Sequence, residues 1–141
     1  MNEVGSSVPA ILRPATLIPR ERGGGARTIP LVSARIGSSK TLSGITEFDP
    51  GAAIALHIHN CEETVLVLEG EAVAEIDGTE HNLRASDTTW IPAGTPHRFR
   101  NPSNTARTRI YWTYASIDAT RTVIATGVTT RIDEEHGVAR G

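Results

Sequence analysis

The sequence predicts an all-β domain of the sandwich or barrel type. From about residue 31 to residue 130 it consists of short runs rich in threonine, valine and isoleucine, without a sustained helical period. Turn residues separate these runs at intervals of about 8–12 residues, which is typical of sandwiches and barrels. The length of 141 residues suits one domain with a single core.

Residues 1–30 are expected to form an extended arm that precedes a barrel of residues 31–130. The arm contains four prolines and the triplet Gly23-Gly24-Gly25. Proline lacks the amide donor and disfavours helix, so the arm should run as an edge strand or a surface loop. Residues 131–141 are polar and are expected to form a frayed or briefly helical tail.

Within the predicted barrel, the clearest local pattern is a hairpin. The pair Asp77-Gly78 separates the β-type runs 72–76 and 79–83. A two-residue type I′ turn requires positive φ at both central positions, and Asp-Gly pairs favour it. We therefore expect two antiparallel strands joined at these residues.

Residues 107–115 are expected to form a strand rich in aromatic residues. One of its faces carries Ile110, Trp112 and Tyr114, and the other carries Arg109, Tyr111 and Thr113. The sequence leaves open which face points inward. Trp112 or Tyr114 would line a pocket if their face is the inner one, and the alternative is a subunit interface.

Three histidines and one glutamate form the most informative pattern. His57 and His59 stand at the end of a run, residues 52–58, that has the composition of a strand. Because strands alternate faces, both imidazoles would project to the same side. Glu63 begins the next run, and His97 follows a stiff turn that contains two prolines and a glycine. Three neutral imidazoles and a carboxylate suit a divalent transition metal.

The spacing around these residues follows two motifs. The first motif runs Gly51, His57-x-His59, Glu63 and Gly70, and the second runs Pro92-x-Gly94, His97 and Asn101. Together they resemble the two conserved motifs of the cupin superfamily, and the resemblance covers residues 51–101. One position departs from the pattern, because Ser86, followed by Asp87, replaces the glycine that usually opens the second motif. This departure concerns a local turn and not the metal site.

The resemblance implies a cupin-type jelly-roll β-barrel that holds a metal inside, near one mouth. By that likeness His57, His59, Glu63 and His97 are the metal ligands. For a metalloenzyme that uses dioxygen, we also expect a catalytic role for Glu63 as an occasional base. The cofactor would be one divalent transition metal per chain, namely iron, manganese, nickel, copper, cobalt or zinc. About two positions of an octahedral ion would stay open for water, substrate or dioxygen.

Residues on the same strand faces as the ligands are candidates for a substrate pocket. Steps of two along the chain from the ligands give Ala53, Ala55, Val65, Val67 and Phe99, and the aromatic strand adds Trp112 and Tyr114. Small side chains leave room for a ligand, and apolar side chains form the usual wall of a small-molecule site. Alternatively these side chains fill the core, and for the two valines both interpretations have equal weight.

Three further residues have ligand chemistry but a simpler explanation. Cys61 lies between two candidate ligands, and a turn residue that points away from the metal is favoured over a soft ligand. His81 follows the hairpin turn and is expected to face solvent. His136 lies in the acidic tail, where a solvated charge cluster is the simpler interpretation.

Three functions fit such a site. The favoured one is a dioxygenase-like oxidoreductase that acts on a small organic substrate, because no lysine or second carboxylate accompanies the ligands as an acid or base. One alternative is a non-redox isomerase, lyase or epimerase that acts on a sugar or hydroxy acid. The other is a cupin that binds a small molecule or metal without turnover.

Composition limits the partners. A net charge of −2, from 14 basic and 16 acidic residues, gives no electrostatic footprint for nucleic acid or an anionic membrane. The apolar runs are far shorter than the roughly 18 residues of a membrane span. A single cysteine excludes an internal disulfide framework. We therefore expect a cytoplasmic protein that pairs as a homodimer through sheet edges or the arm.

Overall fold

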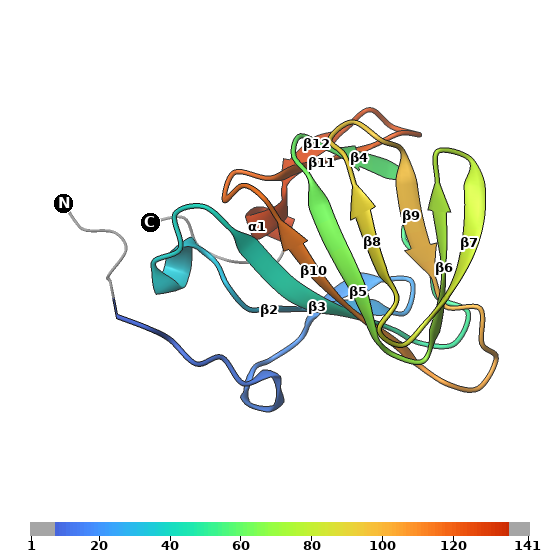
Figure 1. Ribbon diagram of the computed structural model, residues 1–141, viewed down its shortest axis with the longest axis horizontal. Coiled ribbons are helices and arrows are strands. Elements are labelled where there is room, and N and C mark those ends of the chain that lie inside the picture. The colour runs from blue at the N-terminus through green and yellow to red at the C-terminus, as the bar shows by residue number, and fades with distance from the viewer. Residues whose placement is uncertain (1–7, 136–141) are drawn as a thin grey trace.

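The computed structural model describes residues 8–135, which form two antiparallel sheets of six strands each (Figure 1). In spatial order, the first sheet contains β1 (Arg20–Gly23), β2 (Ala26–Pro30), β3 (Leu42–Phe48), β10 (Thr108–Tyr114), β5 (Glu63–Glu69) and β8 (Thr88–Ile91). The second contains β12 (Thr129–Arg131), β11 (Thr120–Val123), β4 (His57–His59), β9 (His97–Arg100), β6 (Glu71–Ile76) and β7 (Thr79–Arg84). This architecture confirms the predicted all-β class.

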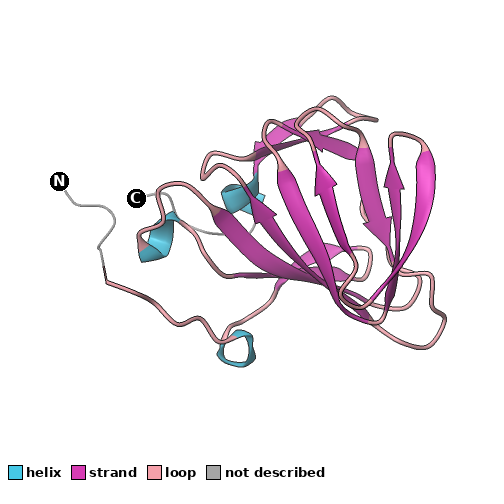
Figure 2. Ribbon diagram, viewed as in Figure 1, coloured by secondary structure: helices cyan, strands magenta, loops and turns pink. Residues whose placement is uncertain are grey.

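Helical structure is confined to three short segments, as Figure 2 shows in cyan. They are the 3₁₀ turns η1 (Pro14–Thr16) and η2 (Ala34–Ile36) and the single α-helical turn α1 (Ile132–Glu135). Within residues 8–135, none of them is long and apolar enough to cross a membrane.

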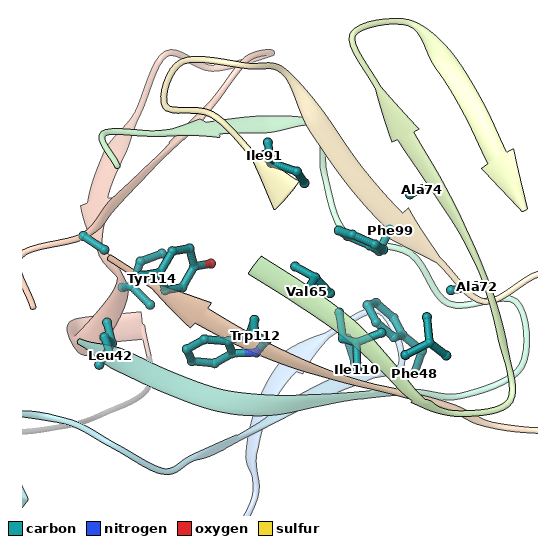
Figure 3. Close-up of a cluster of buried hydrophobic side chains, with 14 of the residues drawn as sticks. Leu42, Phe48, Val65, Ala72, Ala74, Ile91, Phe99, Ile110, Trp112 and Tyr114 are labelled. Atoms are coloured by element: carbon teal, nitrogen blue, oxygen red, sulfur yellow. The ribbon is translucent and has the colours of Figure 1, made fainter. Parts of the chain in front are cut away.

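The hydrophobic core lies between the two sheets. In Figure 3, Trp112 and Val65 of the first sheet lie across from Phe99 of the second. Strand β10 pairs with β3 on one side and β5 on the other, and its side chains alternate between buried and half-buried positions. Ile110, Trp112 and Tyr114 form part of the buried set. The face that the sequence left open is therefore the one that points inward.

The predicted hairpin is confirmed. Strands β6 and β7 pair up to the contact between Ile76 and Thr79, which leaves Asp77 and Gly78 as the turn. Both turn residues have positive φ, 52° for Asp77 and 85° for Gly78, as a type I′ turn requires.

The N-terminal segment differs in part from the predicted arm. Residues 20–30 form β1 and β2, and β2 is hydrogen-bonded to β3 over five residue pairs. In β2 the half-buried Arg27 precedes the buried Thr28, and the prolines stand at the ends of the segment, at Pro19 and Pro30. The sheet therefore begins near residue 20. Ile11 and Ile18 are exposed on the segment before it.

The strand predicted over residues 52–58 is shorter than expected, because only His57–His59 is a strand. Between Gly51 and His57 the backbone makes a single isolated bridge, from Ala53 to Arg100. Gly51 has a φ of 77°, so the chain turns sharply here instead of running straight into β4. The regular alternation of faces does not extend back from His57.

The C-terminal segment also contributes to the fold up to the last described residues. Ile132 is fully buried in the core, and Asp133 is buried beside Arg131, 3.2 Å from its Nε. The predicted brief helix is present as α1, and its first two residues are buried. His136 lies outside the described residues.

Asn101 connects three segments of the chain through its side chain. It is 1% exposed, and its side-chain amide donates to the carbonyl oxygens of Phe48, Asp49 and Ala106. Its Oδ1 accepts from the amide of Ser103. Asn101→Ala leaves these buried groups without their partners, so we expect the free energy of unfolding to fall by about 2–4 kcal/mol.

Chemical denaturation measures this loss. The matched control is Asn82→Ala, since Asn82 is exposed on β7. A loss of stability equal in the two variants would contradict the role assigned to the Asn101 side chain.

Candidate metal centre

Two strands of the second sheet bring the three histidines together. His57 and His59 lie on β4, and His97 begins β9 directly opposite His57 in the ladder. All three are buried, at 1–4% exposure, and one ring nitrogen of each lies within 4.8 Å of those of the other two. The β-type spacing of His57 and His59 thus aims both side chains into the barrel.

The hydrogen bonds of the rings define which nitrogen faces the centre. Each Nδ1 lies near a backbone carbonyl oxygen: His57 to Ala55 at 2.6 Å, His59 to Thr120 at 2.9 Å, and His97 to Thr95 at 2.8 Å. A carbonyl oxygen only accepts, so each Nδ1 carries the hydrogen and donates it. In the neutral imidazoles, Nε2 is then left as a free lone pair, which is the form that binds a metal.

Glu63 reaches the same point from the first sheet. It is the first residue of β5, it is 5% exposed, and its Oε1 lies 3.1 Å from His97 Nε2 and 3.4 Å from His59 Nε2. With neutral rings that donate through Nδ1, both partners in each contact are acceptors. A proton or a cation must therefore lie between them, and three imidazoles with one carboxylate fit a divalent transition metal.

Electrostatics favour deprotonated ligands. Burial, the charge of Arg121 and the neighbouring imidazoles lower the pKa of His57 to about 2. Burial raises the pKa of Glu63, but positive charge shared with His59 and His97 at this point outweighs burial and holds the pKa well below its usual range. His57 is thus neutral and Glu63 ionised near neutral pH, the states that metal ligation requires.

Tyr114 adds a hydroxyl group beside the histidines. Its oxygen lies 3.4 Å from His59 Nε2, and in Figure 3 it points into the space between the sheets. Burial, followed by the charge of Glu63, raises its pKa well above the ordinary value of 10. The phenol therefore stays protonated and can donate a hydrogen bond.

A small cavity of about 20 Å³ adjoins the cluster. Its lining includes three of the four candidate ligands, together with Thr46, Ile54, Phe99, Ile110, Trp112, Tyr114, Arg22 and Arg121. The volume exceeds the roughly 10–15 Å³ that one water molecule needs. The lining combines apolar side chains with two arginines.

The pocket candidates from the sequence divide into two groups. Phe99, Trp112 and Tyr114 line the cavity, whereas Val65 is buried in the core outside the lining. Ala53 and Ala55 are exposed, and Ile54 takes the place that was expected for them. The expectation assumed a straight strand before His57, and the irregular backbone there removes the alternation.

Sequence reasoning did not identify Arg22 and Arg121 as residues of the cavity. Arg22 lies in the segment that was expected to be an arm, and Arg121 lies in a run without a clear apolar pattern. Their place depends on pairing between distant strands, in which Arg121 stands opposite His59. The sequence gives one indication of this place for Arg121, namely that it is a charged residue within a threonine-rich β-type run.

The remaining candidates lie apart from the cluster. Cys61 is half-buried and packs against the hydrophobic core, and it is not part of the three-histidine group. His81 is exposed on β7, as predicted.

Comparison with curated proteins gives partial matches. The chain is 39% identical over 83 residues to polyketide synthase CurC of Streptomyces cyaneus, which is 58% of this chain and 53% of that protein. It is 41% identical over 58 residues to quercetin 2,3-dioxygenase of Bacillus subtilis, which is 40% of this chain and 17% of that protein. The chain thus spans about half the length of CurC and less than a fifth of the dioxygenase.

Solved structures share the fold at low identity. The polyketide cyclase RemF of Streptomyces resistomycificus has a TM-score of 0.72 and 16% identity, over 89% of this chain and 86% of that one. An RmlC-like cupin of Shewanella frigidimarina has a TM-score of 0.68 and 21% identity, over 77% and 92%. The family described as Cupin domain matches residues 44–114, half of this chain. This chain therefore belongs to the cupin family.

Proposed function

We propose that the chain is a metal-dependent oxidoreductase of the dioxygenase type, with one divalent transition metal held by His57, His59, Glu63 and His97. The observation that carries the proposal is the set of three Nδ1–carbonyl hydrogen bonds, which leave three Nε2 lone pairs free, those of His59 and His97 directly beside the Glu63 carboxylate. Four protein ligands leave positions open on an octahedral ion, as catalysis requires.

When bound, the metal supplies redox and Lewis-acid chemistry. The residues of this chain position the substrate and control protons. Glu63 is a ligand that can also accept a proton. The Tyr114 hydroxyl donates a hydrogen bond to a substrate oxygen beside the ligands. Phe99 and Trp112 line the apolar wall and exclude water from the reacting groups.

The similarity to quercetin 2,3-dioxygenase supports oxidation, although it covers 58 residues. The similarity to polyketide synthase CurC supports a substrate that is a small organic molecule. The small cavity favours binding through a narrow end of such a molecule.

Oxygen uptake tests this function. We would load metal-free protein separately with iron, manganese, cobalt, nickel, copper and zinc, and add quercetin, a dihydroxybenzoate or small hydroxy acids. We expect oxygen consumption that depends on a substrate with at least one redox-active metal, and none with zinc or in His57→Ala. Full metal loading without oxygen uptake for any combination would contradict the proposal.

A non-redox lyase or isomerase is the second candidate. The protonated, buried Tyr114 favours it, because such chemistry needs an acid or base besides the ligands. The chain is also 41% identical over 54 residues to dimethylsulfoniopropionate lyase DddW of Ruegeria pomeroyi. Turnover by the zinc-loaded protein without dioxygen would select this candidate. A cupin that binds without turnover would show ligand binding and neither reaction.

A cytoplasmic homodimer stays part of the proposal. The exposed apolar residues Val8, Ile11 and Ile18 of the N-terminal segment support pairing, because a second copy would cover them.

A further inference from the structure

The cavity beside the histidines contains a buried cation that the metal site does not use. Arg121 lines this cavity, and its side chain is 10% exposed. Its Nε is buried and has no hydrogen-bond partner among residues 8–135. Glu135 Oε1 lies 3.6 Å from Arg121 Nε, which is beyond hydrogen-bond distance.

Positive charge exceeds negative charge at this wall of the cavity. Glu135 is shared between two guanidinium groups, since its Oε1 also lies 3.3 Å from Arg22 Nη2. Its other oxygen accepts from the hydroxyl of Thr130. Two arginines thus face one carboxylate. Glu63 also lines the cavity, but its Oε1 faces His59 and His97, where the proposed metal would balance its charge.

Burial makes this surplus costly. Burial and the charge of Arg121 lower the pKa of Arg22, which shows that the two cations oppose each other. An arginine nevertheless stays charged in proteins, so it cannot relieve the strain by losing its proton. A buried guanidinium with an unused donor is stabilised when a ligand supplies an anionic oxygen.

The register places this cation next to the metal ligands. Arg121 on β11 stands opposite His59 on β4, and directly opposed side chains lie on the same face, with Cβ atoms about 4.5–5.5 Å apart. The Tyr114 hydroxyl lies against the Arg121 guanidinium as well as near His59. An anion on Arg121 would therefore lie beside both the phenol and the metal ligands.

We infer that Arg121, assisted by Arg22, binds the carboxylate of the substrate, and that this substrate is a small hydroxy or oxo acid. This inference rests on the proposed function and specifies its substrate class. The fork of guanidinium donors matches a carboxylate in geometry. A neighbouring hydroxyl or carbonyl oxygen of the same molecule then points toward Glu63 and the histidines. The cavity is small, about 20 Å³, which favours a compact acid over a bulky ring system.

Calorimetric titration with glycolate and with its uncharged analogue glycolamide tests the inference. The protein carries whichever metal it retains on purification, and metal content is measured in every sample. We expect the wild type to bind glycolate about 10- to 100-fold more tightly than glycolamide. Arg121→Met should lose this preference and keep its metal, and Arg121→Lys should keep only part of it.

Two further variants test for a gain in glycolate affinity and for no change. Glu135→Gln removes the carboxylate that competes for both arginines, so glycolate should bind several-fold more tightly. Arg84→Met, at an exposed arginine on β7, should change nothing. Circular dichroism shows whether each variant folds. Tighter glycolate binding in Glu135→Gln cannot result from a failure to fold, so it separates a specific effect on the arginines from a loss of structure.

The outcomes are distinguishable from a failure of the proposed function. Equal binding of glycolate and glycolamide, no binding of glycolate at millimolar concentration, or an unchanged preference in Arg121→Met would overturn the inference while metal content stays intact. A protein that takes up no metal but still prefers glycolate through Arg121 would support the carboxylate site and contradict the proposed metal-dependent function.

Discussion

Alanine in place of His57 or His97 is expected to leave a folded protein that no longer retains its metal. Each variant removes one of three Nε2 donors that converge within 4.8 Å. Loss of an outer partner of a metal ligand alone costs about 10–100-fold in affinity, so loss of a ligand should cost more than about 100-fold. Metal content per chain, measured by elemental mass spectrometry, should fall from about one to near zero.

The matched control is His81→Ala, because His81 is a histidine that lies exposed on β7. It should retain the wild-type metal content. Glu63→Gln keeps the shape of the side chain and removes its charge, so metal content should fall, though less than in the histidine variants. Wild-type metal content in both His57→Ala and His97→Ala would show that the metal is bound elsewhere.

Gly70→Ala is expected to cause the largest loss of stability among glycine variants at turns. Gly70 joins β5 to β6 with a φ of 78°, which L-residues adopt at a cost of about 1–2 kcal/mol. A Cβ here would also overlap the carbonyl oxygen of Arg107, which is backbone and cannot swing away. Adding about 1–3 kcal/mol for this overlap, we expect the free energy of unfolding to fall by roughly 2–5 kcal/mol.

Thermal unfolding measures the effect, with Gly78→Ala as the control. Gly78 has a similar φ of 85°, but an added Cβ meets no atom within 4 Å. The control therefore isolates the cost of the backbone conformation. If both variants lose the same stability, the close approach between Gly70 and Arg107 does not contribute.

The clustering of the three histidines could be predicted from the sequence because most of the information for it is local. His57 and His59 share a face through the simple alternation of a strand, and the turn before His97 is fixed by prolines and a glycine. The hairpin at Asp77-Gly78 was predictable for the same reason, since the turn type depends on these two residues.

The arginine wall of the cavity could not be predicted in this way. Arg22, Arg121 and Glu135 are far apart in the chain and meet through β1, β11 and α1. The prediction that Ala53 and Ala55 face the pocket was wrong, because side chains two residues apart share a face only along a regular strand. The backbone before His57 is irregular. Local patterns thus identified the histidines that cluster, whereas strand pairing determined what surrounds them.

Anomalous diffraction from crystals of the metal-supplemented protein, recorded at the absorption edge of the bound metal, tests the central claim most directly. We predict one strong peak among the Nε2 atoms of His57, His59 and His97, with a Glu63 oxygen about 2.0–2.2 Å from it if the metal is zinc. A peak elsewhere would contradict the proposed metal site. So would the absence of any peak in crystals in which His57, His59 and His97 cluster as in this structure.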